Sequence, residues 1–306
     1  MPLVVKARDS EGGSSQPPLT PSEREVTRIL NQASTEMQVA AVSTGVQAAI
    51  ASQDVEQVIF ALPFDRTSEI INQTAQVFGQ VTRDSISAGF PKVGFQGRFD
   101  FTDPRALTYA QEQSATLVTN MTAQMQANVR KIIGRAFEEN INVWDTAKEL
   151  QSVINLTARQ EVTLSKFTEL NRARLMEEGL SGRKLELKLR ELVDKQYKRM
   201  IAQRSKVIAR NEILVAEANG RWLGFEQSIE DGWSDPKSVK RWSTSTDERT
   251  CDICAPMNGM SVQWNEYFPN GVFRNPAHIM CRCSVTLLEP DSSLAQNRMP
   301  TGVVKP

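Results

Sequence analysis

Residues 251–283 read CDICAPMNGMSVQWNEYFPNGVFRNPAHIMCRC and hold all four cysteines and the only histidine of the 306-residue chain. In chain order, these five residues are Cys251, Cys254, His278, Cys281 and Cys283. Zinc prefers thiolate and imidazole ligands and binds four of them in a tetrahedron. The clustering therefore predicts a structural zinc site within these 33 residues.

The spacing of the five residues suggests how they meet. A Cys-x-x-Cys turn brings two sulfurs to one point, and in an extended segment Cys281 and Cys283 face the same side while Arg282 faces away. His278 follows Pro276 in a loop that can bring it in. Five candidates compete for four places. We expect Cys251, Cys254 and Cys281 as ligands, and the sequence leaves open whether His278 or Cys283 is the fourth.

Other interpretations of the cysteines remain open: two disulfides, inert buried thiols, or a catalytic or redox metal. The N-terminal residues lack the apolar core of a secretory signal, so four cysteines fit a reducing cytosol better than a disulfide framework. A module of about 55 residues also buries little apolar surface by itself. A zinc site contributes on the order of 10 kcal/mol in small peptides and would offset that deficit.

Outward from the cluster, residues 233–288 are rich in Trp, Pro, Gly, Asn and Cys and contain short extended runs. The runs cover residues 240–244, 260–264 and 284–288. They predict a small β-containing Cys/His module, zinc-knuckle-like in character. The polar tail 289–306 is expected to fray or to bind as an extended strand.

Upstream, residues 105–232 are expected to form a body of long amphipathic helices, near 106–138, 143–153 and 157–178 and from 181 onward. Apolar residues recur every fourth position, which indicates helix faces that pack together in a core. One stripe is Leu117, Met121, Met125, Val129 and Ile133, and another is Leu185, Leu189, Val193, Tyr197 and Ile201. Gly179 is expected to end the helix before it.

The N-terminal part divides into a flexible arm, 1–20, and a helical region with a linker, 21–104. Thr20 and Pro21 are typical of a helix start. Two or three helices are expected over residues 23–87, with a break near Pro63. The predicted fold class is mainly α, with long amphipathic helices and the small C-terminal β-containing module.

Charge limits the function. The chain has 36 basic and 36 acidic residues, so a general nucleic-acid coat is excluded, and no segment is apolar enough to cross a membrane. Residues 181–213 nevertheless hold ten basic and four acidic side chains, a local sum of +6. This stretch can face DNA phosphates, or it can be a solvated helix face or meet an acidic protein surface.

The motifs around the cysteines resemble those of the phage Mu protein F-like family of minor head, or head morphogenesis, proteins. The matching elements are KRWSTSTDERTCDIC at 240–254, the turn MNG at 257–259, and NPAHIMCRC at 275–283. The helical element IARNE at 208–212 is similar to one in the family, with Asn211 in place of the usual Thr. The resemblance covers roughly residues 105–288, and residues 1–100 match nothing specific.

The resemblance implies a non-enzymatic virion protein, made in the host bacterial cytoplasm and located in the head interior or at the portal vertex. Its partners would be the portal protein and other head proteins, with a role in DNA packaging or delivery, and without a membrane or a small-molecule substrate. Asp247 and Arg249 match the family motif. Arg249 can donate a fork of hydrogen bonds that braces the metal loop, and Arg282 is a third bracing candidate. An exposed ion pair of little energetic consequence is the alternative.

Two other functions compete with this one. A metal-dependent His-Asn-His nuclease is suggested by Asn275 and His278, since such enzymes often carry Cys-x-x-Cys clamps. Against it, one histidine would have to serve both as general base and at the metal, and no second one remains to hold a catalytic Mg²⁺. The second is a zinc-stabilised nucleic-acid-binding adaptor.

Overall fold

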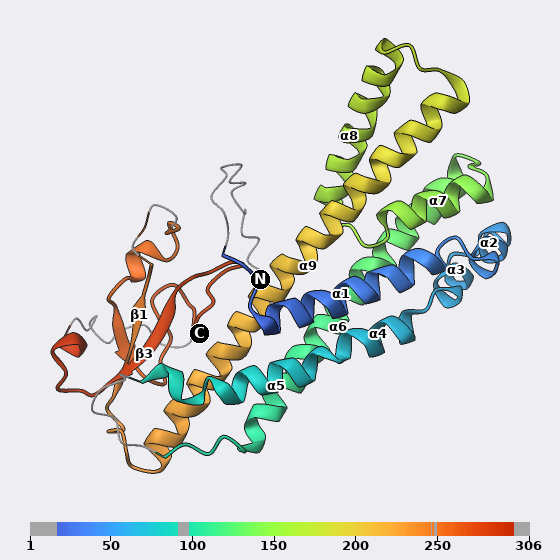
Figure 1. Cartoon of the computed structure of the whole chain (residues 1–306). Helices are drawn as coiled ribbons and strands as arrows, with labels where there is room; N and C mark the ends of the chain where they lie inside the picture. Colours follow the sequence, from blue (N-terminus) through green and yellow to red (C-terminus); the bar gives the residue numbers. More distant parts are fainter. Residues whose placement is uncertain (1–16, 91–97, 246, 248–249, 297–306) are drawn as a thin grey trace. The chain divides into compact units, whose positions relative to one another are not determined.

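The computed structural model describes residues 17–90, 98–245, 247 and 250–296. It is mainly helical and has a three-stranded antiparallel sheet near the C-terminus, which confirms the predicted fold class (Figure 1). The chain forms two compact units. Unit 1 contains residues 1–24, 75–113 and 207–306, and unit 2 contains residues 25–74 and 114–206. Residues 1–16 of the predicted arm and residues 297–306 of the predicted tail lie outside the described residues.

The N-terminal region contains more helices than the sequence suggested. It forms α1 (Pro21–Ala40), α2 (Thr44–Ala51), α3 (Val55–Ala61), α4 (Phe64–Asn72) and α5 (Thr74–Asp84), so the expectation of two or three helices was wrong. The reason is local capping. Ser43 accepts a hydrogen bond from the Val46 amide and starts α2, and Asp54 accepts from the amides of Glu56 and Gln57 and starts α3.

The start of α1 is a reciprocal cap. The Glu23 amide donates to the Thr20 hydroxyl at 3.2 Å, and the Glu23 carboxylate accepts from the Thr20 amide at 2.7 Å. Two otherwise unpaired amides of the first turn are thereby satisfied. This confirms the helix start predicted from Thr20 and Pro21.

The long helices follow the predicted ranges closely. They are α6 (Pro104–Glu138), α7 (Val143–Val153), α8 (Ala158–Glu177) and α9 (Gly182–Glu230). The stripe from Leu117 to Ile133 is buried, as the core interpretation requires. Gly179 adopts a φ of 84° just after α8, a left-handed conformation that glycine takes without strain. The expected helix ends are therefore confirmed.

In unit 2, α8 and the first part of α9 run side by side as an antiparallel helical hairpin (Figure 1). Its distal core is formed by Leu175, Leu185 and Leu189. Its proximal core contains Leu164 and Tyr197 together with Leu156 and Ile201. Asn155 donates to the Tyr197 hydroxyl at 3.0 Å, so the phenol in this core has a hydrogen-bond partner.

Unit 1 contains the sheet, whose strand order is β2-β1-β3. The strands are β1 (Val239–Ser243), β2 (Ser261–Gln263) and β3 (Ser284–Leu288), close to the three predicted runs. Arg241 pairs with Ser261 on one side and with Thr286 on the other. A core of aromatic, cysteine and aliphatic side chains joins this sheet to the end of α9 and includes Trp222, Phe225, Trp242, Phe268 and Val285.

The last turns of α9 pack closely on α5 and on the 3₁₀ helix η1 (Ile86–Gly89) in unit 1. A Cβ atom on Gly220 would lie 2.1 Å from the Thr82 carbonyl oxygen, and one on Gly224 would lie 2.0 Å from that of Ile86. Only glycine permits backbones to approach this closely. The predicted domain boundaries themselves stay a prediction, although β1 begins soon after α9 ends at Glu230. Among the described helices, none is both long and apolar enough to cross a membrane.

Candidate metal centre

Two segments of the module supply the predicted ligands. The first is the turn that leads into the 3₁₀ helix η2 (Ala255–Met257), where the amides of Cys254 and Ala255 both donate to the Cys251 carbonyl, at 3.1 and 2.9 Å. The second is the segment before β3, where the Cys281 amide donates to the His278 carbonyl at 3.1 Å. Hydrogen-bonded turns therefore hold the side chains in each segment close together.

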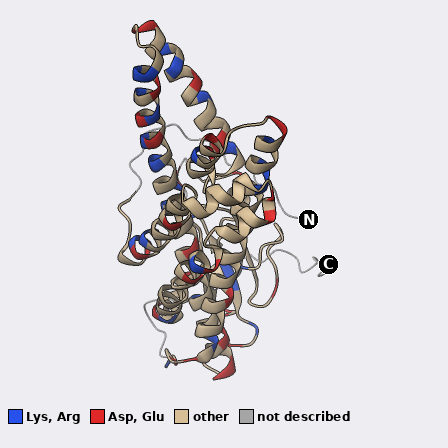
Figure 2. Ribbon diagram, turned by 90° about the vertical axis from the view of Figure 1, so that its right-hand side faces the viewer, with Lys and Arg blue, Asp and Glu red and all other residues tan. Residues whose placement is uncertain are grey.

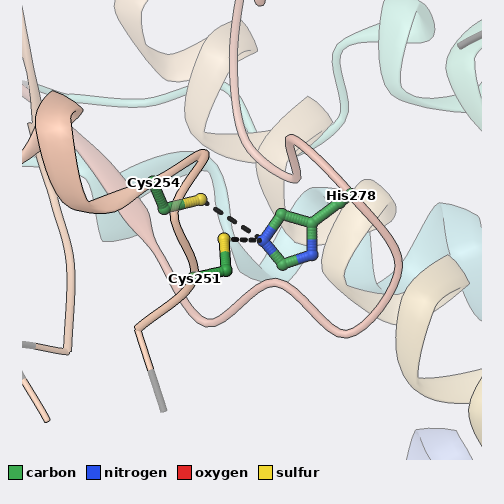
Figure 3. Close-up of side chains that lie close together, drawn as sticks. All are labelled: Cys251, Cys254 and His278. Carbon is green, nitrogen blue, oxygen red and sulfur yellow. Dashed lines mark hydrogen bonds between the residues drawn. The ribbon is translucent and has the colours of Figure 1, made fainter. Parts of the chain in front are cut away.

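The imidazole of His278 lies against two thiols (Figure 3). Its Nε2 atom is 3.0 Å from Cys251 Sγ and 3.3 Å from Cys254 Sγ, and Cys254 Sγ is 4.0 Å from Cys281 Sγ. For comparison, zinc–sulfur bonds of about 2.3 Å place tetrahedral ligands about 3.8 Å apart. The spacing of these atoms is close to what one zinc ion requires.

All five predicted ligands meet around one cysteine. Cys251, Cys254 and His278 form one group whose ligand atoms lie within 4.8 Å of one another, and Cys254, Cys281 and Cys283 form a second. Cys254 belongs to both groups. All four cysteines are free thiols, so the structure does not contain the two disulfides considered as an alternative. These groups could hold a metal ion.

The second ring nitrogen of His278 fixes the state of the first. Nδ1 lies 2.9 Å from the carbonyl oxygen of Ile279, which can only accept a hydrogen bond, so Nδ1 carries the proton. Nε2 then directs a lone pair at the thiols. This is the arrangement expected of a metal-binding histidine, whose other nitrogen is held by a backbone carbonyl or a carboxylate.

The thiols lie in an apolar environment that disfavours charge. Cys254 and Cys281 are buried, as is Cys283, and they pack in the core that contains Trp242. Burial, followed by the neighbouring Cys281, raises the pKa of the Cys254 thiol, and the same two causes raise the pKa of Cys283. Thiolates in this site need a compensating positive charge, which a bound divalent cation would supply.

The three bracing candidates have different outcomes. Arg282 is exposed between the two buried cysteines, as predicted, and its guanidinium donates to both carboxylate oxygens of Asp247, at 2.7 and 2.6 Å. Arg249 lies outside the described residues. The bracing role expected of Arg249 therefore stays a prediction, while Arg282 and Asp247 form a fork of their own. This fork joins the segment before Cys251 to the segment that carries Cys281.

The structure shows one site that the sequence analysis missed. Lys240 on β1 is fully buried, and its ammonium donates to the Phe273 carbonyl oxygen at 2.7 Å. Its Nζ atom lies 3.6 Å from the ring centroid of Phe273 and 5.3 Å from those of Trp222 and Phe268. Burial, and then the nearby Arg274, lower the pKa of Lys240 to about 7 against the opposing effect of Glu266.

This buried lysine connects the metal module to the rest of unit 1. Phe273 lies in the loop before His278, and Trp222 lies on α9, so a single cation contacts the sheet, the ligand loop and the helix. Arg274 adds a second contact, with its guanidinium carbon 5.5 Å from the ring centroid of Tyr109 on α6. No signal in the sequence indicates this contact, because no lysine lies between the two Cys pairs and Lys240 reaches Phe273 and Trp222 only through tertiary packing.

Comparison with known proteins bears on the C-terminal half of the chain. Residues 168–286 match the family described as Phage Mu protein F like protein, which confirms the resemblance seen in the motifs. The match begins within α8, includes all of α9 and ends in β3, so it contains the whole Cys/His cluster. No curated protein and no solved structure matches the chain significantly.

Proposed function

We propose that this chain, whose residues 168–286 match the phage Mu protein F-like family, is a minor head protein that docks on the portal and supports head morphogenesis. The family match over α9 and the Cys/His module is the observation that carries this proposal. Under this proposal the chain lies in the virion, at the portal vertex or in the head interior, and has a role in DNA packaging or delivery. The proposal assigns no enzymatic activity to the chain.

Zinc ordering of the C-terminal module is the second part of the proposal. We assign Cys251, Cys254, His278 and Cys281 as the ligands, because His278 presents a fixed lone pair and Cys281 Sγ lies 4.0 Å from Cys254 Sγ. Cys283 then remains a buried thiol beside the site. Bound zinc would neutralise the thiolates and lock two separate segments into one rigid surface.

The geometry favours this structural role over the nuclease alternative. A general base needs a ring nitrogen that can reach a water or a substrate proton. In His278, Nδ1 is bound to the Ile279 carbonyl and Nε2 is directed at Cys251 and Cys254. Asn275 is buried, with only 2% of its surface exposed. Neither residue is available for hydrolysis in this arrangement.

The α8–α9 hairpin is the docking element of this proposal. Four large apolar side chains are exposed on it although its core is filled: Val162, Leu170, Met176 and Leu187. Leu170 has 72% of its surface exposed. Scattered apolar side chains are normal on protein surfaces, whereas contiguous apolar patches mark binding surfaces, so the proposal rests on the family match and these four positions serve to test it.

Co-purification tests the proposal directly. The tagged chain is expressed with the portal protein of the same phage, and purified heads are examined for the chain by mass spectrometry. We expect the chain to co-purify with the portal ring, and the triple variant Leu170→Ser/Met176→Ser/Leu187→Ser to do so much less while it keeps its metal. Absence of the wild-type chain from both portal rings and heads would refute the proposed function.

A further inference from the structure

The basic side chains of residues 181–213 are not equally available. Arg204 is largely buried and donates to the Asn155 carbonyl and to Gln124, at 2.7 and 2.8 Å. Arg210 interacts with Glu23, and Lys198 pairs with Asp194 at 2.7 Å. These three bases stabilise the fold or are neutralised. The excess of charge in this segment therefore depends on the other seven.

Five of those seven bases lie on one face of α9, within unit 2. Their spacing alternates between four and seven residues, and at about 100° per residue this places them in a sector of about 60°. We call them the basic stripe: Lys184, Lys188, Lys195, Arg199 and Lys206. All five are exposed. Arg183 and Arg190 point to a different side of the helix.

The stripe carries almost uncompensated positive charge. Projected on the helix, no acidic residue falls within its sector, and only Glu191 lies at its edge, paired with Lys188 at 2.9 Å. Among the described residues, no carboxylate lies within ion-pair distance of the other four bases. In the ribbon of Figure 2, Lys and Arg positions recur along the α8–α9 hairpin, interleaved with Asp and Glu positions.

We infer that the basic stripe binds the phosphate backbone of double-stranded DNA. The stripe is about 33 Å long at 1.5 Å per residue, close to one turn of B-DNA. The cations are about 6 and 10.5 Å apart along the helix, and long flexible Lys and Arg side chains at these intervals can each reach a phosphate of a duplex that carries one per about 1.7 Å of axis, both strands counted. This inference rests on the proposed function, because a minor head protein is enclosed with the packaged genome.

The chemistry of the stripe favours duplex over single-stranded nucleic acid. Proteins that bind single strands without sequence preference stack bases on exposed aromatic rings. The only aromatic residue between 182 and 206 is Tyr197, which is buried and hydrogen-bonded to Asn155. Lysine and arginine on the stripe would contact phosphates, so binding should be independent of base sequence.

Fluorescence anisotropy of the full-length chain with a labelled 30-base-pair duplex of arbitrary sequence, at 50–300 mM salt, tests the inference. Five phosphate contacts predict a slope of log K against log salt near about −4.5. The variant Lys195→Gln/Arg199→Gln removes two contacts, so the slope should become shallower by about 1.8 and the affinity at 50 mM salt should fall about tenfold or more. A duplex of different sequence should bind equally well.

The matched control is Arg183→Gln/Arg190→Gln, which removes the same charge from exposed positions elsewhere on the helix. We expect its slope to change by less than half as much, and circular dichroism to show both variants fully helical. Equal effects of both variants, or wild-type DNA binding that is indifferent to Lys195 and Arg199, would overturn the inference. So would a wild-type chain that binds no DNA while the Lys195→Gln/Arg199→Gln variant loses the portal, because the stripe would then face an acidic protein. Portal binding and metal content should stay normal in both variants. A failure of DNA binding can then be distinguished from a failure of the proposed function.

Discussion

Both terminal nitrogens of Arg282 donate to the carboxylate of Asp247, at 2.7 Å to Oδ2 and 2.6 Å to Oδ1. The pair joins two segments that are 35 residues apart and that each lead to metal-binding side chains. Asp247 raises the pKa of Arg282 through these hydrogen bonds. About a third of each side chain is exposed to solvent, so the pair contributes little to the global stability of the protein. Its effect is to restrict the relative motion of the two segments.

Replacing the fork by a single donor should loosen the metal site. In Arg282→Lys the charge is kept but the two parallel hydrogen bonds are lost, so we expect zinc to dissociate several-fold faster while the melting temperature of the loaded protein changes little. Release can be followed with a chromogenic chelator in stopped flow. Asp247→Asn, which removes the acceptor charge of the pair, should speed release in the same way. Its matched control is Asp252→Asn, which removes the same charge from an exposed position inside the Cys-x-x-Cys turn and should leave the release rate unchanged. Identical release rates for wild type and Arg282→Lys would contradict a bracing role.

The ligand set can be determined by substitution. We expect one zinc per chain in the wild type, and loss of stoichiometric zinc in His278→Ala and in Cys281→Ala. Cys283→Ala should keep the metal, because Cys283 is not needed to complete four ligands. Elemental analysis together with a count of reactive thiols checks this. Loss of zinc in Cys283→Ala with retention in His278→Ala would show that the fourth ligand is Cys283.

Removal of the metal should affect the module and spare the helices of unit 2. A chelator at neutral pH should expose the four cysteines to thiol reagents. It should also change the near-ultraviolet circular dichroism of Trp242, which packs in the same core. The hairpin core around Leu175 and Leu185 contains no ligand, so most helical circular dichroism should persist. Thiols that stay unreactive after complete metal removal would show that packing alone holds the site.

Lys240 should make stability depend on pH above neutrality. Its pKa in the folded chain is about 7, below the value of 10.5 for an exposed lysine, so the unfolded chain binds more protons between these pH values. The free energy of unfolding therefore rises with pH across this window, by on the order of a few kcal/mol, as the cost of burying the charge is relieved. Arg274 and Glu266 are the charged groups that act on Lys240.

The variant Lys240→Met isolates this contribution. The free energy of unfolding of wild type and variant is measured with denaturant at pH 7 and pH 10. The wild-type value should rise relative to that of the variant between the two pH values. The methionine keeps most of the apolar stem but cannot titrate. A difference that stays constant between these pH values would mean that the cation–π contacts and the Phe273 carbonyl keep Lys240 protonated throughout.

The sequence predicted the elements that depend on local periodicity and on ligand chemistry. The stripe from Leu117 to Ile133 and the run 284–288 were visible because each has the period of its own element. The five Cys and His side chains could be grouped because zinc chemistry restricts which side chains meet, although the choice between His278 and Cys283 stayed open. The short N-terminal helices were not resolved, since Ser43 and Asp54 act as caps only in a particular backbone conformation.

Contacts between distant segments were beyond local reasoning. Arg282 and Asp247 come together because both ligand segments converge on one site, and the partner of Arg282 could not be inferred from spacing. The burial of Lys240 depends on Phe273 and Trp222, which lie far from it in sequence. Such contacts are fixed by tertiary packing, which leaves no period in the sequence.

Gly224 is a further residue of this kind, and it supplies a sharp test of the packing in unit 1. An alanine Cβ there would lie 2.0 Å from the Ile86 carbonyl oxygen, which belongs to the backbone and cannot rotate away. Overpacking of this sort costs about 1–3 kcal/mol, while the better helix propensity of alanine returns at most about 1 kcal/mol. Gly224→Ala should therefore lower the melting temperature.

Gly134→Ala is the control, because a Cβ at Gly134 on α6 meets no atom of the described residues within 4 Å and only the propensity gain remains. Thermal denaturation followed by circular dichroism should show opposite shifts for the two variants, and a Gly224→Ala protein as stable as Gly134→Ala would mean that α9 and η1 are not packed backbone to backbone.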